Sequence, residues 1–353
     1  MKAVVPGPDP GQAVFVGVDV SRATWAFNVR WGGQERRRWS SPGELSHALA
    51  LVTQYAAVPL HVAYEASGFG YEIAWALRER GVQVTVVAPS TIARAPGLRV
   101  KTDRVDARLL AEQLEQGRLK AVHIPTRADH ERRQLSRAYD QAVQDRKRAQ
   151  ARVRALLQEH GRLGPGPRAG WTAYTTWLAA HTLPGPVRLC VDELLASRQH
   201  AQHRAQRLQR ALLETAAEPA YAPVVQALSA QPGIGSLTAI RLRLELGDMR
   251  RFHTAGSFAH YLGLTPAEYS SGERVQRGHL LKCGPGAVRG WLVQCAWASV
   301  RGRHADERLR EVFERLRSRA GAKRAIIAVT RRLALRVRAR WLAGEQTSLP
   351  HAA

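Results

Sequence analysis

The stretch Ala13-Val-Phe-Val-Gly-Val-Asp-Val20 is an apolar run with one carboxylate, Asp19, close to its end. Its β-branched and aromatic residues predict a buried strand. A second apolar run, at residues 59–65, also ends in a carboxylate, Glu65. If the two strands are neighbours in one sheet, the two carboxylates can meet at one edge of that sheet.

The residues around these two strands alternate between strand patterns and helix patterns. Rough alternation of polar and apolar residues predicts an antiparallel partner strand at residues 24–31, and β-branched residues predict a further strand at 82–87. We therefore expect an α/β domain of mixed strand order over residues 13–125. Helical patterns lie between and after the strands, at residues 42–55, 70–80 and 102–116.

Asp103 and Asp106 lie three residues apart at the start of the last predicted helix, so both side chains project from one face. Magnesium prefers hard oxygen ligands, and two-metal phosphoryl transfer needs several carboxylates around ions about 3.5–4 Å apart. Each acid alone has an ordinary interpretation, because Asp103, for example, could be a helix N-cap. Together with Asp19 and Glu65, in a chain with 29 acidic and 53 basic residues, they favour a site for two Mg²⁺ ions.

Charge narrows the choice of partner. The chain has 353 residues and a formal net charge of +24, which attracts polyanions such as nucleic acids, although a ribosomal or chromatin-type protein would share it. No run of roughly 18 or more apolar residues indicates a membrane span, and the N-terminus lacks a signal-peptide pattern. We therefore expect a cytoplasmic protein. Three widely spaced cysteines fit neither a disulfide framework nor a zinc-binding spacing.

Residues 126–220 lose the strand pattern and are rich in Ala, Arg, Gln and Leu. Apolar residues recur there at helical spacing, on both sides of a break at Gly164-Pro-Gly-Pro167. Long polar helices seldom stand alone, so the pattern predicts a coiled-coil-like arm that joins protomers or contacts nucleic acid. An ordinary helical linker is the alternative.

Residues 221–345 predict a third, mostly helical unit. Gln231-Pro-Gly-Ile-Gly235 opens a helix, and its turn could present backbone N–H groups to a phosphate near Gly233 and Gly235, as in a helix–hairpin–helix grip on DNA. A tight turn is the commoner explanation for such a motif alone. Residues 301–340 combine an apolar stripe with basic blocks, which predicts an amphipathic helix whose basic face is either solvated or in contact with phosphate.

Three blocks in the first 110 residues resemble the DEDD insertion-sequence transposases of the IS110 (IS1111) group, whose N-terminal domain is similar to RuvC Holliday-junction resolvases. The resemblance implies an RNase H-like (RuvC-like) α/β fold and a magnesium-bound tetrad made of the four acids named above. The blocks are Gly17-Val-Asp-Val-Ser21, Tyr64-Glu-Ala-Ser-Gly68 and Lys101-Thr-Asp-Arg-Val-Asp-Ala107.

Motifs in the last third resemble the C-terminal transposase domain of the same group. In that family a serine beside a glycine is implicated as the nucleophile on DNA, and by position this is Ser271, with Ser270 as the fallback. Ser-Ser-Gly by itself would indicate only a turn. The motifs are Tyr261-Leu-Gly-Leu-Thr-Pro266, Ala267-Glu-Tyr-Ser-Ser-Gly272 and His279-Leu-Leu-Lys282.

Basic residues around this serine are candidate contacts to nucleic acid. Arg274, Arg277 and Lys282 could stabilise the charge of the phosphate under attack. Lys101 and Arg289 complete the predicted contacts. No His or Asp lies at a spacing that assigns a base to the serine, so activation by the bound magnesium is the expected route.

The resemblance therefore implies a transposase or site-specific recombinase of a prokaryotic mobile element. It would act at the nucleoid on element ends and target DNA, through a transient phosphoserine link, as a dimer or tetramer, and with an element-encoded structured RNA (a bridge RNA) as guide. Two alternatives stay open. A hydrolytic junction nuclease would need the tetrad but not Ser271, and a non-enzymatic basic DNA-binding protein would need neither.

Overall fold

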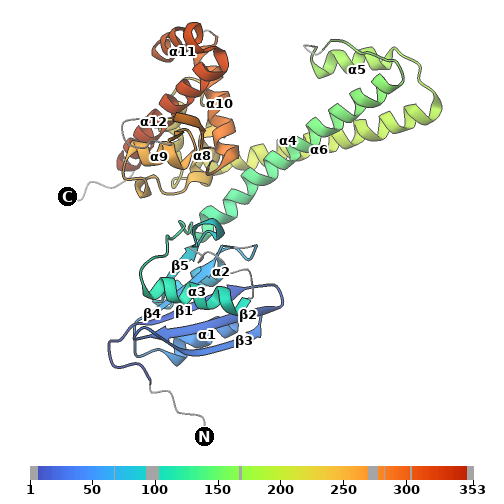
Figure 1. Cartoon of the computed structure of the whole chain (residues 1–353). Helices are drawn as coiled ribbons and strands as arrows, with labels where there is room; N and C mark the ends of the chain where they lie inside the picture. Colours follow the sequence, from blue (N-terminus) through green and yellow to red (C-terminus); the bar gives the residue numbers. More distant parts are fainter. Residues whose placement is uncertain are drawn as a thin grey trace. The chain divides into compact units, whose positions relative to one another are not determined.

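The computed structural model describes residues 7–66, 68–92, 103–166, 169–268, 277–281, 283–302 and 304–347. The chain divides into two compact units, Met1–Arg127 and Ala128–Ala353, and each is described by itself (Figure 1). The predicted helical arm and the predicted C-terminal domain both fall within the second unit.

A mixed five-stranded sheet forms the centre of the first unit, in the order β3-β2-β1-β4-β5. β1 pairs antiparallel with β2 and parallel with β4, while the outer pairs are antiparallel β2–β3 and parallel β4–β5. Three antiparallel strands followed by two parallel ones are the RNase H-like arrangement, so the expected fold class is confirmed. The strands are β1 (Val14–Val20), β2 (Thr24–Trp31), β3 (Gln34–Pro42), β4 (Leu60–Glu65) and β5 (Gln83–Val87).

Helices cover both faces of this sheet (Figure 1). Alternate residues of β1, the valines at 14, 16, 18 and 20, are buried in one core with residues of α1 (Leu45–Gln54) and α2 (Glu72–Arg78). The helix α3 (Asp103–Glu115) lies against the opposite face, over β1 and β2. The period-two pattern of β1 thus decides which side chains face each helical layer.

The strand β3 is the element of the first unit that the sequence does not predict. Its residues, Gln34–Pro42, are mostly charged or polar and mostly exposed. It lies at the edge of the sheet, where only one side of the strand needs a partner. Charged side chains on such an edge also discourage pairing with other chains.

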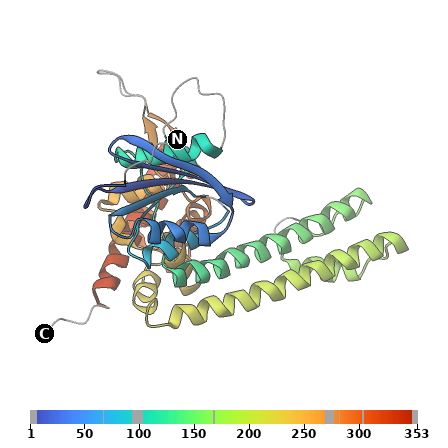
Figure 2. The same cartoon turned by 90° about the horizontal axis from the view of Figure 1, so that it is seen from below.

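Two long helices extend through the second unit, α4 (Arg127–Glu159) and α6 (Gly185–Ala217), and they run side by side in both views (Figures 1 and 2). Both were expected from the helical spacing, and the small residues Ala149 and Ala201 are buried between neighbouring helices. The sequence does not predict the short helix α5 (Trp171–Ala179). Its Tyr174 packs against the end of α4 and the beginning of α6.

The beginning of α4 and the end of α6 meet a compact group of helices. The apolar stripe predicted for the tail is buried in α12 (Ala322–Thr347), through Ile326, Val329, Leu333 and Val337. None of the described helices is long and apolar enough to cross a membrane. The other elements of the group are α7 (Ala222–Ser229), α8 (Ser236–Leu246), α9 (Ala255–Tyr261), β6 (Pro266–Glu268), β7 (Arg277–Leu280), α10 (Gly286–Val300) and α11 (Glu307–Ala320).

Candidate active site

Asp19 and Glu65 lie at matching positions of two neighbouring parallel strands. Val18 of β1 pairs with Tyr64 of β4, so the two acids are one step further along each strand. Matched residues of neighbouring parallel strands point to the same face, and such strands lie about 4.8 Å apart. The two half-buried carboxylates therefore share one face at the C-terminal edge of the sheet.

The helix α3 approaches this same face at Gly17. A Cβ atom at that position would lie 2.5 Å from the backbone nitrogen of Ala111 and closer still to the carbonyl oxygen of Ala107. No other residue fits there without moving the helix. A glycine inside a strand is a known signal for such close approach of another backbone, so the sequence contained a clue to this contact.

An ion pair sets the direction of α3 across the sheet. Arg30, which pairs with Phe15 at the beginning of β1, donates from Nε to Glu115 Oε2 at 2.9 Å. Since Glu115 ends α3, the C-terminal end of the helix lies near the beginning of β1. The N-terminal end, which carries Asp106, is therefore directed toward the end of β1, where Asp19 lies.

The four predicted ligands thus come from three elements that converge on one edge. Asp106 is half-buried like the two strand acids, whereas the side chain of Asp103 and the whole of Lys101 lie outside the described residues. Among the described side chains, no group of three His, Cys, Asp or Glu residues is close enough to hold a metal ion. The donors are the hard oxygen ligands that magnesium requires, so their chemistry fits the ion, and the metal-binding role of the four acids stays a prediction.

The turn that follows Asp19 is held by Ser21. Its hydroxyl accepts from the Thr24 N–H at 3.2 Å and donates to the Thr24 carbonyl oxygen, and its own carbonyl accepts from Trp25 Nε1 at 3.1 Å. These contacts hold the connection between β1 and β2, and with it the end of the strand that carries Asp19. Serine in a turn is the sequence signal for this role.

The candidate nucleophile lies in the chain between β6 and β7. These two short strands pair antiparallel, with Glu268 opposite Arg277. Ser270, Ser271, Arg274 and Lys282 lie outside the described residues, as does the side chain of Arg277. Their roles therefore stay predictions.

The segment for which the sequence predicts a helix–hairpin–helix grip contains α7, a short turn and α8. Gly233 has φ +89° in this turn, and a Cβ there would lie 2.6 Å from the carbonyl oxygen of Cys295 in α10. A glycine is thus required at 233 by packing within the protein. Gly235 precedes α8 and has open space around the position of a Cβ. Both glycines are exposed, and phosphate contact stays a prediction for both.

Some basic residues of the C-terminal unit already bind groups of the protein itself. Arg289 Nη1 donates to the carbonyl oxygens of Leu262 and Cys283, both at 2.9 Å. Arg338 Nη2 donates to the carbonyl oxygen of Phe252 at 2.7 Å. These contacts fix loops next to α9 and α10, which gives Arg289 a structural role beside the predicted contact with nucleic acid.

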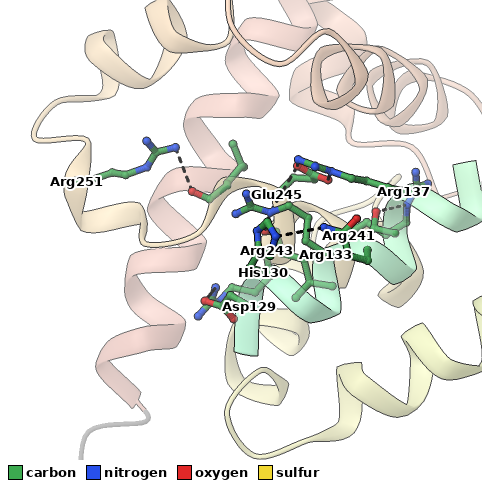
Figure 3. Close-up of polar contacts among 12 residues, drawn as sticks. Asp129, His130, Arg133, Arg137, Arg241, Arg243, Glu245 and Arg251 are labelled. Carbon is green, nitrogen blue, oxygen red and sulfur yellow. Dashed lines mark hydrogen bonds and ion pairs between the residues drawn. The ribbon is translucent and has the colours of Figure 1, made fainter. Parts of the chain in front are cut away.

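A network of charged groups fixes the beginning of α4 to α8 (Figure 3). Arg133 donates from Nε to the Leu244 carbonyl oxygen at 2.8 Å. Asp129 accepts a hydrogen bond from the Tyr221 hydroxyl at 2.7 Å and pairs with Arg243 at 3.4 Å. Burial, followed by this hydrogen bond to Asp129, raises the pKa of Tyr221 to about 12.

Arg241 is the most enclosed member of this network, since only 8% of its side chain is exposed. It forms an ion pair with Asp140, donates to Ser136 Oγ at 3.2 Å and lies 3.9 Å from the ring centre of Trp291. A buried charge is tolerated only with such partners. These contacts join the beginning of α4 to α8 and the helices around it. The helical spacing of the sequence does not predict this connection.

Comparison with known proteins gives the family. A transposase model of the DEDD type for the IS110 group matches residues 16–161, and the model described as the IS116/IS110/IS902 family of transposases matches residues 225–314. A putative transposase of Sinorhizobium fredii is 35% identical over 292 residues, which cover 80% of this chain and 71% of that protein. The chain belongs to the IS116/IS110/IS902 transposase family.

Further members are similar over most of their length. The transposase of insertion sequence IS1328 from Yersinia enterocolitica is 27% identical over 80% of this chain and 82% of its own.

Among solved structures, T. thermophilus RuvC in complex with Holliday junction substrate is 15% identical, with a TM-score of 0.23, over 31% of this chain and 99% of that chain. Membership of the transposase family confirms the predicted class, an insertion-sequence transposase that cleaves and recombines DNA. It rules out the alternative of a non-enzymatic DNA-binding protein.

Proposed function

We propose that this transposase exchanges DNA strands by magnesium-dependent phosphoryl transfer, with Asp19, Glu65, Asp103 and Asp106 as the metal ligands and Ser271 as the nucleophile. The observation that carries the proposal is the matched register of Asp19 and Glu65 at the edge that α3 approaches with its N-terminal end. Carboxylates that reach one face from two neighbouring strands and a helix are the hard oxygen donors that Mg²⁺ takes.

Bound Mg²⁺ would supply Lewis-acid stabilisation of the phosphate and of the attacking and leaving oxygens. The four carboxylates would hold it, and because the described acids alone do not form a close group, binding must include Asp103 and draw the side chains together. The Gly17 contact and the Arg30–Glu115 pair would keep α3 in position for this.

Ser271 would act in two balanced steps. First, its hydroxyl loses a proton and Oγ forms a bond to phosphorus, while the bond from phosphorus to a deoxyribose oxygen breaks and that oxygen takes up a proton. Second, a hydroxyl of another strand loses its proton and its oxygen forms a bond to phosphorus, while the bond from phosphorus to Ser271 Oγ breaks and Oγ takes up a proton, which joins the strands and releases the serine. Arg274, Arg277 and Lys282 would stabilise the negative charge in both steps.

The expected partners of the protein are DNA, a structured guide RNA and further copies of the chain. A net charge of +24 suits broad contact with DNA and with a structured guide RNA of the kind the family resemblance implies. Two long polar helices such as α4 and α6 seldom stand alone, which favours contact with a second copy of the chain, as a dimer or tetramer.

The test is a denaturing-gel search for a covalent protein–DNA adduct, with labelled element-end DNA and Mg²⁺. Wild type and Ser270→Ala are expected to give the adduct, and Ser271→Ala is expected to give none while it still binds DNA. Ser270→Ala is the matched control because it removes a hydroxyl from the neighbouring position. Cleavage by Ser271→Ala without an adduct would instead support the hydrolytic alternative.

A further inference from the structure

A cavity of about 500 Å³ lies in the first unit, at the end of the sheet away from Asp19. Trp31 and Tyr55 form its inner wall, and Arg36 and Arg37 of β3 line it together. Its volume is in the range of sites for small organic molecules, roughly 300–1,000 Å³. Nothing in the proposed strand-exchange chemistry uses this cavity.

A β-bulge explains how two consecutive arginines line one cavity. Side chains of a regular strand alternate between the two faces of a sheet. Here Arg30 pairs with Glu35 and Val29 pairs with Arg37, so Arg36 is an extra residue without a partner in the register. The bulge therefore places Arg37 on the face of Val29, the face covered by α1, beside Arg36. Bulges commonly redirect side chains in this way at functional sites.

The two arginines are also electrostatically unlike their neighbours. Arg38 and Arg108 both lie within 4 Å of Glu35, at 3.7 and 3.9 Å. Among the described residues, neither Arg36 nor Arg37 has a carboxylate within that distance. Arg36 donates from Nε to the Trp31 carbonyl oxygen at 3.3 Å and lies 5.4 Å from the centre of that ring. The remaining guanidinium donors are available to an anion.

The rest of the lining suits an organic group attached to that anion. Ala57 and Val58 provide an apolar side, and the Tyr55 hydroxyl accepts a hydrogen bond from Gln54 Nε2 at 3.2 Å and can donate its own. Arginine forks match phosphate oxygens, and apolar surfaces accept unstacked bases. Together with the charge of the whole chain, these features favour a nucleotide over a small carboxylic acid.

From these observations we infer that the cavity binds one unpaired nucleotide of a nucleic-acid strand, with its phosphate on Arg36 and Arg37 and its nucleoside against Ala57 and Val58. The inference goes beyond the proposed strand exchange and depends on it only in taking nucleic acid as the ligand. Trp31 lies five residues along β2 from Ala26, the partner of Asp19, or about 17 Å. The cavity is therefore a holding site for a strand and not the place of reaction.

The test uses the full chain and two fluorescent decamers, oligo-dT and oligo-rU, each with one photoreactive 4-thio base. Arg36→Gln/Arg37→Gln is expected to weaken binding about tenfold and to lower the salt slope of log K by roughly 0.7 for each phosphate that the variant no longer neutralises. Ala57→Phe fills the cavity without changing charge, and it is expected to weaken binding with the slope unchanged. Crosslinks in the wild type should map to the residues that line the cavity, and the decamer that binds more tightly identifies the strand as DNA or RNA.

Two controls separate the cavity from general attraction to a basic protein. Arg118→Gln/Lys120→Gln removes the same charge from exposed positions of the same unit and should change affinity less than about twofold. The crosslinking is done without Mg²⁺, so its result does not depend on whether the strand-exchange proposal holds. Crosslinks that map elsewhere, or full binding by Ala57→Phe, would overturn the inference.

Discussion

The sheet edge of the first unit and the α4–α8 junction of the second both bring together acids that are far apart in sequence, but they treat those acids differently. At the junction, Asp129, Asp140 and Glu245 each meet an arginine within 4 Å. At the sheet edge, Asp19 and Glu65 each follow one member of the last pair in the register, Val18 and Tyr64, on two neighbouring parallel strands. Opposite charges in contact stabilise a fold, whereas carboxylates that share one face at the ends of neighbouring strands are donors that a divalent cation can take. The difference separates a structural site from a candidate active site.

Asp19→Asn is the substitution with the largest expected effect, a loss of strand cleavage. It removes one charged metal ligand, so strand cleavage should fall by about 1,000-fold, as expected when about 4 kcal/mol of transition-state stabilisation is removed. The melting temperature without Mg²⁺ should change little, because Asn has nearly the same size as Asp and the position is only half-buried. The measurement pairs a cleavage assay with thermal unfolding, and Asp9→Asn, at an exposed position, is the control. A lower melting temperature in Asp19→Asn would place this acid in the structural class instead.

Arg241→Ala should do the reverse. Without the arginine, which bonds to Asp140 and Ser136 and stacks on Trp291, a partly buried acid has no partner, so the unfolding free energy should fall by about 2–4 kcal/mol. Denaturant unfolding measures the change. Arg250→Ala removes a surface arginine that pairs with Asp248 and should leave stability unchanged. Equal unfolding curves for Arg241→Ala and the wild type would show that the junction does not hold the helices together.

Tyr221→Phe should have the smallest effect on stability, and that effect should depend on pH only in the alkaline range. The pKa of Tyr221 is raised from 10 to about 12, so its neutral form is favoured in the folded state. The resulting stability is fully present below pH 10 and is lost as pH rises through 12. The difference in unfolding free energy between wild type and Tyr221→Phe should therefore shrink over that window. A difference that stays constant from pH 9 to pH 12 would contradict the raised pKa of Tyr221, which results from burial and from the hydrogen bond to Asp129.

Most strands of the first unit can be predicted from the sequence, because each is marked by a pattern of neighbouring residues. β1, β4 and β5 are runs of apolar residues with clear ends, and the acids that follow or end them are visible in the printed sequence. The pairing of β1 with β4 is not visible, because the register joins residues more than 40 positions apart. The family resemblance supplied that information before the structure did.

The features that local patterns missed depend on contacts between distant residues. β3 has too many charged residues to resemble a strand, and only its pairing with β2 makes it one. The bulge at Arg36 is a property of that pairing, so the cavity beside it has no signal in the sequence. Arg30 and Glu115, 85 residues apart, form the ion pair that orients α3. Pairs of this kind cannot be found from periodicity, which reports only on neighbours along the chain.

The central claim is that four carboxylates at the sheet edge bind the catalytic ion. The most direct test is diffraction from crystals of the full chain soaked with Mn²⁺ in place of Mg²⁺, with anomalous scattering used to locate the metal. We expect metal peaks within about 2.2 Å of carboxylate oxygens of Asp19 and Glu65, together with Asp103 or Asp106, and the loss of those peaks in Asp19→Asn. Metal bound only elsewhere, or peaks that persist unchanged in Asp19→Asn, would contradict it.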